Sequence, residues 1–413
     1  MIKFIHTADV HFGMENYGKI DQKTGIHSRL LDFNKALNFC IDRGIEEKID
    51  FFLFAGDAYK TANPSPTQQR LLMRSLLRLH EKNIPVIIIV GNHDNPLSFG
   101  KANALDIFGD MPLDGFYVVS KPMVINLATK NGPVQIVGIP WPTRNTIAMS
   151  QQHLHKSARE ITEYISQSVT TIITNFAQQL DPAIPAILSS HLTVSSGIFS
   201  GSEKRAIYGN DPIFLPSQLA IPPFDYVALG HLHRHQNLNS NGYPAVVYSG
   251  SIERVDFGER KEDKGFCLVS IEKKGTTSYK FIKGPMRPFI QIEARLDAGD
   301  GQTEQLLEEI KKYDITDAVI KILYHLPAGK KDRIDLPTIQ RECASAIHVV
   351  GILPIRAVET RERRASMKVD MDLSTLLTTY FEAKEEFKDR KDLLIQKALD
   401  LEVEACEHEH EER

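Results

Sequence analysis

The chain has 413 residues, of which 42% are hydrophobic and 25% are charged, and its formal net charge at pH 7 is -4. This composition excludes collagen-like, low-complexity and wholly disordered chains. The longest purely apolar run, residues 85–90, is far shorter than the roughly 20 residues that a membrane-spanning helix needs. We see no cleavable apolar leader, and the 4 cysteines are scattered, so we expect free thiols in a reducing cytoplasm. The net charge by itself argues against a protein that coats nucleic acid.

Short apolar strands alternate with amphipathic segments over residues 1 to about 275. We predict buried strands over residues 2–7, 50–55, 85–90, 134–139, 186–190 and 225–229. Apolar residues at helical spacing predict helices over residues 30–48, 67–82 and 157–180. This alternation of strands and helices is typical of α/β layering.

A turn-rich segment near residues 283–290 begins a second part of the chain. Beyond it we predict a small βαβαβ unit, with strands over residues 289–296, 318–324 and 349–352 and helices over residues 302–312 and 336–346. A basic stretch then leads to a helix over about 372–404 with an apolar stripe that includes Tyr380, Phe387 and Leu394. The predicted domains are residues 1–282, residues 283–355, a basic linker over 356–371 and a helical tail over 372–413.

Polar side chains directly follow five of the predicted strands. They are Asp9 and His11, then Asp57, then Asn92, His93 and Asp94, then His191, then His231 and His233. In α/β sheets ligands bind outside the carboxyl ends of the strands, so these side chains can converge. Residues two apart on an extended backbone face the same side. Gly56, Gly91 and Gly230 precede three of these groups, and glycine allows a close approach of the backbone.

Seven of these side chains form a predicted set of metal ligands: Asp9, His11, Asp57, Asn92, His191, His231 and His233. Seven ligands are too many for one tetrahedral ion and suit two ions that share a bridging carboxylate. Imidazole, carboxylate and amide without thiolate favour Mn, Fe or Zn. Two ions about 3.5–4 Å apart polarise a phosphoryl oxygen and generate hydroxide, so the pattern predicts metal-assisted phosphoester hydrolysis. We expect His93 to act as a general acid or transition-state donor and Asp94 to orient it.

Each of these motifs alone is commonly a polar turn, and it is their occurrence at five strand ends that favours a site. In order along the chain, D-x-H, GD, GNHD, H and GHxH resemble the pattern of the calcineurin-like metallophosphoesterase superfamily. Longer segments resemble the bacterial SbcD subfamily, the nuclease subunits of SbcCD complexes. These segments are residues 7–13, 55–66, 90–96, 138–144, 188–197, 229–236 and 248–259.

The resemblance implies a four-layer αββα metallophosphoesterase domain, a small α/β capping domain that positions DNA, and a C-terminal helical tail. It implies two Mn²⁺ ions, with Mg²⁺, Fe²⁺ or Zn²⁺ as alternatives. One ion would be held by Asp9, His11, Asp57 and His233, and the other by Asp57, Asn92, His191 and His231. His93 would be the catalytic histidine. Lys60 stands where some relatives carry a second histidine.

The resemblance also implies a function and partners. The expected activities are a 3′-to-5′ exonuclease on double strands and an endonuclease on single strands and hairpins, in DNA repair, recombination and replication. The tail would bind an SbcC-type SMC-like ATPase, and the chain would form a homodimer within a heterotetramer at the nucleoid in the cytoplasm. Two alternatives stay open: a small-molecule phosphodiesterase or phosphatase on the same site, and a DNA-end tethering scaffold. Candidates for contacts to DNA phosphates are Arg29, Arg70, Arg74, Arg234, Arg254, Arg260 and Lys261.

Overall fold

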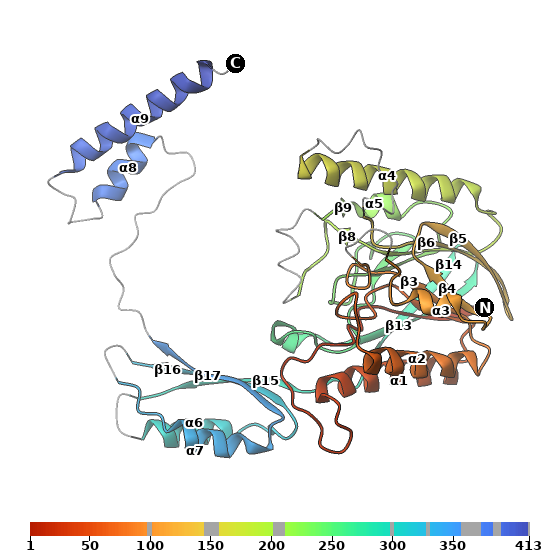
Figure 1. Ribbon diagram of the computed structural model, residues 1–413, viewed down its shortest axis with the longest axis horizontal. Helices are drawn as coiled ribbons and strands as arrows, with labels where there is room; N and C mark the ends of the chain where they lie inside the picture. The colour runs from red at the N-terminus through yellow and green to blue at the C-terminus, as the bar shows by residue number, and fades with distance from the viewer. Residues whose placement is uncertain are drawn as a thin grey trace. The chain divides into compact units, whose positions relative to one another are not determined.

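Two six-stranded sheets form the centre of the larger part of the protein (Figure 1). The computed structural model describes residues 1–96, 101–143, 157–200, 211–297, 301–327, 331–356, 373–382 and 390–411. The first sheet has the order β14 (Thr276–Lys283), β13 (Gly265–Lys273), β1 (Ile2–Thr7), β2 (Phe51–Phe54), β3 (Val86–Ile89) and β4 (Phe116–Val119). The second has the order β11 (Gln236–Asn237), β12 (Ala245–Tyr248), β10 (Tyr226–Gly230), β7 (Ala186–His191), β6 (Gly132–Ile139) and β5 (Met123–Thr129).

The central strands are apolar throughout because both of their faces are buried. Along β2, Phe51 and Leu53 lie in the core between the two sheets. Phe52 and Phe54, which point to the other face, lie in the core that the first sheet shares with its helices. The run of four apolar residues therefore serves two cores at once.

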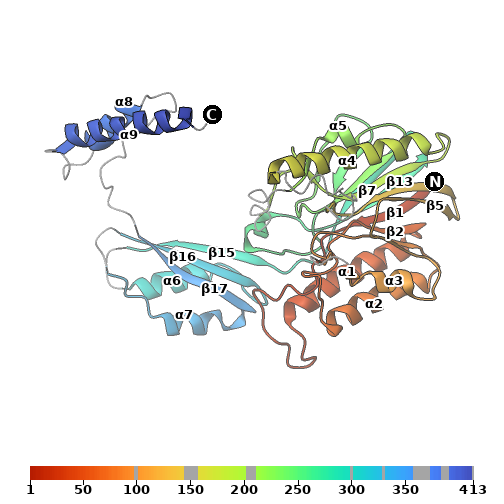
Figure 2. The same cartoon turned by 45° about the horizontal axis from the view of Figure 1, so that its top comes forward.

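Helices cover the outer face of each sheet (Figures 1 and 2). The helices α1 (Ser28–Glu46), α2 (Pro66–His80) and α3 (Asp106–Asp110) contribute to the core of the first sheet. The helices α4 (Ala158–Gln179) and α5 (Pro216–Leu219) contribute to the core of the second. Capping boxes start α2 at Ser65 and α4 at Ser157. The predicted four-layer αββα architecture is confirmed.

All six predicted strands are present, and the sheets also contain strands that the prediction omitted. Strand β5, for example, lies at a sheet edge and alternates buried and exposed residues, so it has no continuous apolar run to mark it. Strands β8 (Thr193–Val194) and β9 (Ile213–Phe214) pair in a two-stranded ribbon. A 3-10 helix, η3, spans Phe257–Lys261.

The chain divides into two compact units, one formed by residues 1–292, 311–322 and 337–352 and the other by residues 293–310, 323–336 and 353–413. The segment after residue 288 follows the predicted βαβαβ order. It contains β15 (Phe289–Arg295), α6 (Gln302–Ile310), β16 (Val319–Leu326), α7 (Leu336–Glu342), the 3-10 helix η4 (Cys343–Ser345) and β17 (His348–Arg356). The three strands form one sheet in the order β15-β16-β17. The domain boundaries given above stay a prediction.

The C-terminal tail differs from its prediction. Where we predicted one helix over residues 372–404, the structure describes two, α8 (Leu373–Glu382) and α9 (Lys391–Glu411). They lie side by side in both views (Figures 1 and 2). The predicted linker lies almost entirely outside the described residues, as does Phe387 of the predicted stripe.

Among the described residues no helix combines the length and apolar character needed to cross a membrane. Cys40, Cys267 and Cys343 are buried free thiols, as the scattered cysteines predicted.

Candidate active site

The five predicted strand ends meet at one place. Strands β1, β2 and β3 are parallel neighbours in the first sheet, and β7 and β10 are parallel neighbours in the second. The loops after β1 and β2 run together, because the N–H of Asp9 donates to the carbonyl of Gly56 at 2.9 Å and the N–H of His11 donates to the carbonyl of Asp57 at 3.0 Å. The carboxyl ends of both sheets therefore supply side chains to a common site.

All seven predicted ligands are brought together there. Ligand atoms of Asp9, His11 and His233 lie within 4.8 Å of one another, and so do those of Asp9, Asp57 and His191. The oxygen Oδ2 of Asp57 lies 3.7 Å from Nε2 of His11 and 3.4 Å from Nε2 of His191. This carboxylate therefore lies between two groups of ligands, as a bridging carboxylate must.

The second group is centred on the amide of Asn92. Its Oδ1 lies 2.9 Å from Nε2 of His191 and 3.2 Å from Nδ1 of His231. His231 thus presents Nδ1 to its neighbours, whereas His191 presents Nε2. These contacts group Asn92, His191 and His231, and the division of the seven side chains between two ions stays a prediction.

The backbone is held in an unfavourable conformation at four of the seven positions. Asp9, His11, Asp57 and His231 have φ values of 55°, 49°, 59° and 106°. Residues with a side chain seldom adopt positive φ, and such conformations persist only where the surrounding structure enforces them. The strain concentrates at residues that carry the predicted chemistry, which supports a functional role for this site.

The glycines beside the ligands allow the loops to approach closely. A Cβ on Gly91 would lie 2.1 Å from Oδ1 of Asp57, and a Cβ on Gly230 would lie 2.0 Å from the carbonyl oxygen of Ala55. A side chain at Gly91 would push apart the loops after β2 and β3, and one at Gly230 would push the second sheet away from the first.

Hydrogen bonds of the ring nitrogens that point away from the site fix the orientation of His191 and His233. Nδ1 of His191 lies 2.8 Å from the carbonyl oxygen of Ala55, so it carries the hydrogen and donates it. Nδ1 of His233 lies 2.9 Å from Oε1 of Glu259 and donates in the same way. Each ring therefore directs Nε2 into the site, where it can bind a cation once it is deprotonated. Nε2 of His233 lies only 3.0 Å from Nε2 of His11. Converging nitrogen and oxygen lone pairs without a thiolate fit two divalent cations.

Burial and mutual charge shift the pKa values of these groups. Burial raises the pKa of Asp9 to about 7. Burial also acts to raise the pKa of Asp57, but the imidazoles of His191 and His11 hold it well below its usual range. Burial lowers the pKa of His231 to about 3. At neutral pH Asp57 is an anion and His231 is neutral, which are the states in which these side chains bind a cation.

His93 lies at the edge of this ligand set. Its Nδ1 is 2.9 Å from the carbonyl oxygen of Lys60, and its backbone N–H donates to Oδ1 of Asp57 at 2.9 Å. Because Nδ1–H is occupied by that carbonyl, Nε2 is the nitrogen left to meet a substrate. One of its ring nitrogens lies within 4.8 Å of ligand atoms of His11 and Asp57.

The expected role of Asp94 is wrong. Its carboxylate does not orient the His93 ring, which Lys60 holds instead. Asp94 is fully buried and accepts four backbone hydrogen bonds, from the N–H groups of Asp57, Ala58, Tyr59 and Gly91 at 2.9–3.2 Å. It joins the loop after β2 to the loop after β3, and so it fixes the distance between Asp57 and Asn92.

Three side chains near the ligands were not predicted. Glu259 contacts His233, and Lys264 contacts Glu259 at 2.9 Å. Trp141, the only tryptophan of the chain, has its ring centroid 4.9 Å from that of His231. Trp141 and Glu259 lie in segments that carry the SbcD resemblance, and that was the one signal in the sequence that could have drawn attention to them.

One of the candidate DNA-contact residues, Arg29, is wrong. Arg29 is fully buried and pairs with Asp32 at 2.9 Å, with its guanidinium over the ring of Phe289. Arg254 donates to the carbonyl of Arg287 at 2.6 Å. Both join α1 and the loop after β12 to the start of β15. Arg70, Arg74, Arg234 and Lys261 are exposed, and Arg260 is half-buried.

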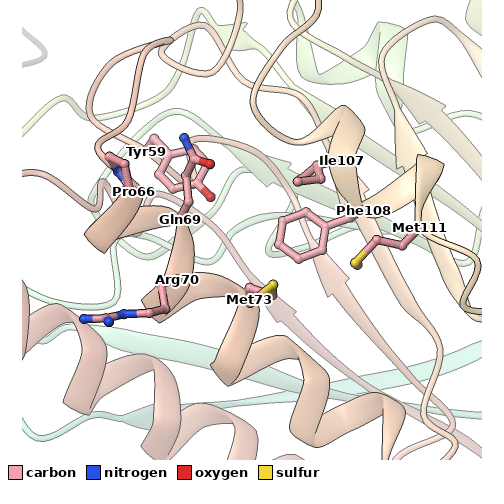
Figure 3. Close-up of a pocket in the computed structure, with 8 residues that line it drawn as sticks. All are labelled: Tyr59, Pro66, Gln69, Arg70, Met73, Ile107, Phe108 and Met111. Carbon is pink, nitrogen blue, oxygen red and sulfur yellow. The ribbon is translucent and has the colours of Figure 1, made fainter.

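A cavity of about 220 Å³ is lined by residues of α2, α3 and the loops beside them (Figure 3). It is lined by Tyr59, Pro66, Gln69, Arg70, Met73, Ile107, Phe108 and Met111. Its lining holds neither a carboxylate nor an imidazole among the described residues, so it is separate from the metal ligands.

Histidine, aspartate and asparagine side chains at the ends of facing sheets, arranged around a central carboxylate, define a phosphoester hydrolase with a site for two metal ions. The sequence model of the calcineurin-like phosphoesterases matches residues 2–235. The chain belongs to this family.

Solved structures with a similar fold include a dimetal phosphatase from Danio rerio, which is 12% identical over 65% of this chain and 92% of that chain, with a TM-score of 0.38. A protein of Thermus thermophilus is 12% identical over 68% of this chain and 98% of its own, with a TM-score of 0.37. The NAD nucleotidase of Haemophilus influenzae is 14% identical over 68% of this chain and 49% of its own, with a TM-score of 0.38.

The four hydrogen bonds to Asp94 generate a stability prediction. An Asp94→Asn variant keeps one acceptor oxygen, but its NH₂ group faces at least one of the backbone N–H groups that the lost oxygen accepted from, and each buried donor left unpaired costs about 1–3 kcal/mol. We expect the free energy of unfolding, measured by urea denaturation, to fall by more than about 2 kcal/mol. Asp21→Asn is the matched control, since Asp21 also accepts a backbone N–H, from Thr24, but in an exposed turn. Equal stability of the two variants would contradict this role of Asp94.

Proposed function

We propose that this chain is the metal-dependent nuclease subunit of an SbcCD-type complex and hydrolyses DNA phosphodiesters. The observation that carries the hydrolytic part is the double ligand set around Asp57 with His93 beside it. The DNA part rests on the resemblance of residues 138–144, 188–197, 229–236 and 248–259 to the SbcD subfamily. In this proposal the substrate is double-stranded, single-stranded or hairpin DNA, in repair, recombination and replication.

The proposed cofactor is a pair of Mn²⁺ ions, with Mg²⁺, Fe²⁺ or Zn²⁺ as alternatives. When bound, two such ions supply charge that stabilises a phosphoryl group and lower the pKa of a water molecule. His93 would then act at the leaving oxygen. Burial lowers the pKa of His93, and its Nδ1–H bond to the carbonyl of Lys60 opposes that shift. In the protonated ring, Nε2–H would donate its proton to the leaving oxygen.

Exposed cations near the ligands support a polyanionic substrate. Arg234 directly follows the ligand His233 and is exposed, and Lys60, near His93, is half-buried. A small phosphodiester reaches the metal ions alone, whereas a DNA strand extends past them and meets such side chains. This difference separates the nuclease from a small-molecule phosphoesterase on the same site.

The proposed partners follow from the tail and from α2, the described helix between β2 and β3. In α9, Leu393 and Leu401 are 68% and 61% exposed, and exposed leucines on a helix suit docking into a groove of another protein. We infer that this face binds the SbcC-type ATPase. We also propose that the homodimer contact lies at α2. The open apolar cavity between α2 and α3 supports this placement. The proposed location is the cytoplasm, at the nucleoid.

The first test concerns the substrate. With Mn²⁺ and the ATPase partner, the full chain should degrade linear duplex DNA. An Arg234→Gln variant should bind DNA more weakly, with the slope of log affinity against log salt reduced by about 1. Turnover of bis-p-nitrophenyl phosphate should not change.

The control for this test is Arg43→Gln, which removes a half-buried arginine from the last turn of α1 and should leave the DNA affinity as it is. Efficient turnover of the small diester without any degradation of DNA would favour the small-molecule phosphoesterase. DNA binding without hydrolysis of either substrate would favour the tethering scaffold.

The second test concerns His93. A His93→Asn variant keeps its backbone hydrogen bond to Asp57 but cannot donate a proton from a ring. Loss of general acid catalysis lowers the rate by about 100- to 10,000-fold. The measurement is the single-turnover rate of DNA cleavage, with metal content determined on the same samples. Full activity at unchanged metal content would show that His93 is not the acid.

The third test concerns the tail. A Leu393→Glu/Leu401→Glu variant should lose co-purification with a co-expressed SbcC-type ATPase, because charges replace the apolar side chains of the proposed contact. Its turnover of bis-p-nitrophenyl phosphate should equal that of the unchanged protein. Gln396→Glu adds a charge to the same helix without removing an apolar group and should keep the complex. If the leucine variant still binds one-to-one, this face of α9 is not the contact.

A further inference from the structure

Two charged side chains outside the ligand set are buried beside it. Glu259, in η3, and Lys264, directly before β13, both have fully buried side chains, and Nζ of Lys264 lies 2.9 Å from Oε2 of Glu259. Replacing a buried ion pair by apolar residues of similar volume is often neutral or stabilising. Stability alone therefore does not account for these two charges.

Both members of the pair bind the same residue. Oε1 of Glu259 lies 2.9 Å from Nδ1 of His233, and Nζ of Lys264 donates to the backbone carbonyl of His233 at 2.8 Å. The ring of His233 and its peptide group are thus held by the two ends of one ion pair. A side chain held at its ring alone could still move with its loop, but His233 is fixed at both points.

The remaining hydrogen-bonding capacity of the pair is also used. Oε2 of Glu259 accepts the N–H of Val255 at 2.9 Å, and Lys264 donates to Oε2 of Glu262 at 3.0 Å. The ammonium group thus has three acceptors, in Glu259, Glu262 and the carbonyl of His233. A group satisfied in this way is locked in one rotamer, which gives His233 a rigid support.

We propose that the Glu259–Lys264 pair is a positioning device that keeps His233 in its Nδ1–H tautomer and directs Nε2 toward the first metal ion. Glu259 accepts the Nδ1 hydrogen, so the lone pair remains on Nε2, and Lys264 fixes both Glu259 and the peptide group of His233. The inference rests on the proposed metal site, which it deepens by naming what orients one ligand. Partners of this kind typically change metal affinity by about 10- to 100-fold when they are mutated.

The experiment uses Glu259→Gln in the full-length chain. If the amide oxygen stays on Nδ1 of His233, the NH₂ group faces Lys264 and the N–H of Val255, which are both donors. If the amide turns over, its oxygen accepts from those donors and its NH₂ group donates to Nδ1 of His233. The second orientation selects the other tautomer of His233. We expect Mn²⁺ affinity, measured by the electron paramagnetic resonance signal of free Mn²⁺, to fall about 10- to 100-fold. We also expect the imidazole ¹⁵N spectrum to lose the Nδ1–H form of His233.

Asp225→Asn is the matched control. Asp225 is another buried acid that pairs with a lysine, Lys274, at 2.8 Å, but it precedes β10, whereas the ligand His231 follows that strand. This variant should lose stability and keep its Mn²⁺ affinity within about twofold. Should Glu259→Gln fail to fold, Glu259→Asp keeps a carboxylate for Lys264 while withdrawing it from His233 by one methylene, and the same two measurements apply.

Two outcomes separate this inference from the proposed function. If the variant binds Mn²⁺ as tightly as the unchanged protein and His233 keeps its Nδ1–H tautomer, the positioning role is overturned. If the unchanged protein binds no divalent ion, the proposed metal centre fails. The tautomer of His233 in the two proteins then still decides whether Glu259 orients the ring.

Discussion

Oδ1 of Asp57 accepts the backbone N–H of His93, and its Oδ2 lies within 3.7 Å of imidazoles that come from two different sheets. A fully buried carboxylate in this position is stable only while positive charge or hydrogen-bond donors surround it. Moving the two sheets apart at this end would therefore take the imidazole of His191 away from this carboxylate. The packing of the αββα layers and the geometry of the site therefore depend on each other.

Holding this carboxylate in place requires backbone conformations that the chain would otherwise avoid. Asp57 itself has a φ of 59°, and the hydrogen bonds from the N–H groups of residues 57–59 to Asp94 keep its loop closed. Asp94 also accepts the N–H of Gly91 at the end of β3. One buried carboxylate thus fixes the shape of two loops, and another, Asp57, is held by them at the centre of the ligands.

Much of this arrangement could be predicted from the sequence, because a strand end followed by Asp, Asn or His is a local pattern. The strands, the glycines and the seven ligand candidates are all of this kind. Asp94 was predicted as a site residue with the wrong role, because three of its four partners are backbone groups more than 30 positions away. Arg29 was misassigned for a similar reason, since a basic residue on an amphipathic helix normally faces solvent and this one is covered by Phe289. Apart from the family resemblance of the segment that holds Glu259, nothing in the sequence marks Glu259 and Lys264, since only the folded chain brings them to His233.

The net charge of -4 first argued against nucleic acid, but it says little about this site. Asp9 and Asp57 contribute two negative charges among the seven predicted ligands, and two divalent ions would contribute about four positive ones, so a loaded site would be locally positive. A phosphate group would meet that local field rather than the charge of the whole chain. Every phosphoester carries such a group, so the ligand set selects the reaction and leaves the substrate open. The choice between DNA and a small diester must then depend on side chains that only a longer substrate reaches. Arg234 is exposed and follows His233, the ligand that Glu259 and Lys264 contact. It is therefore placed to take part in that choice.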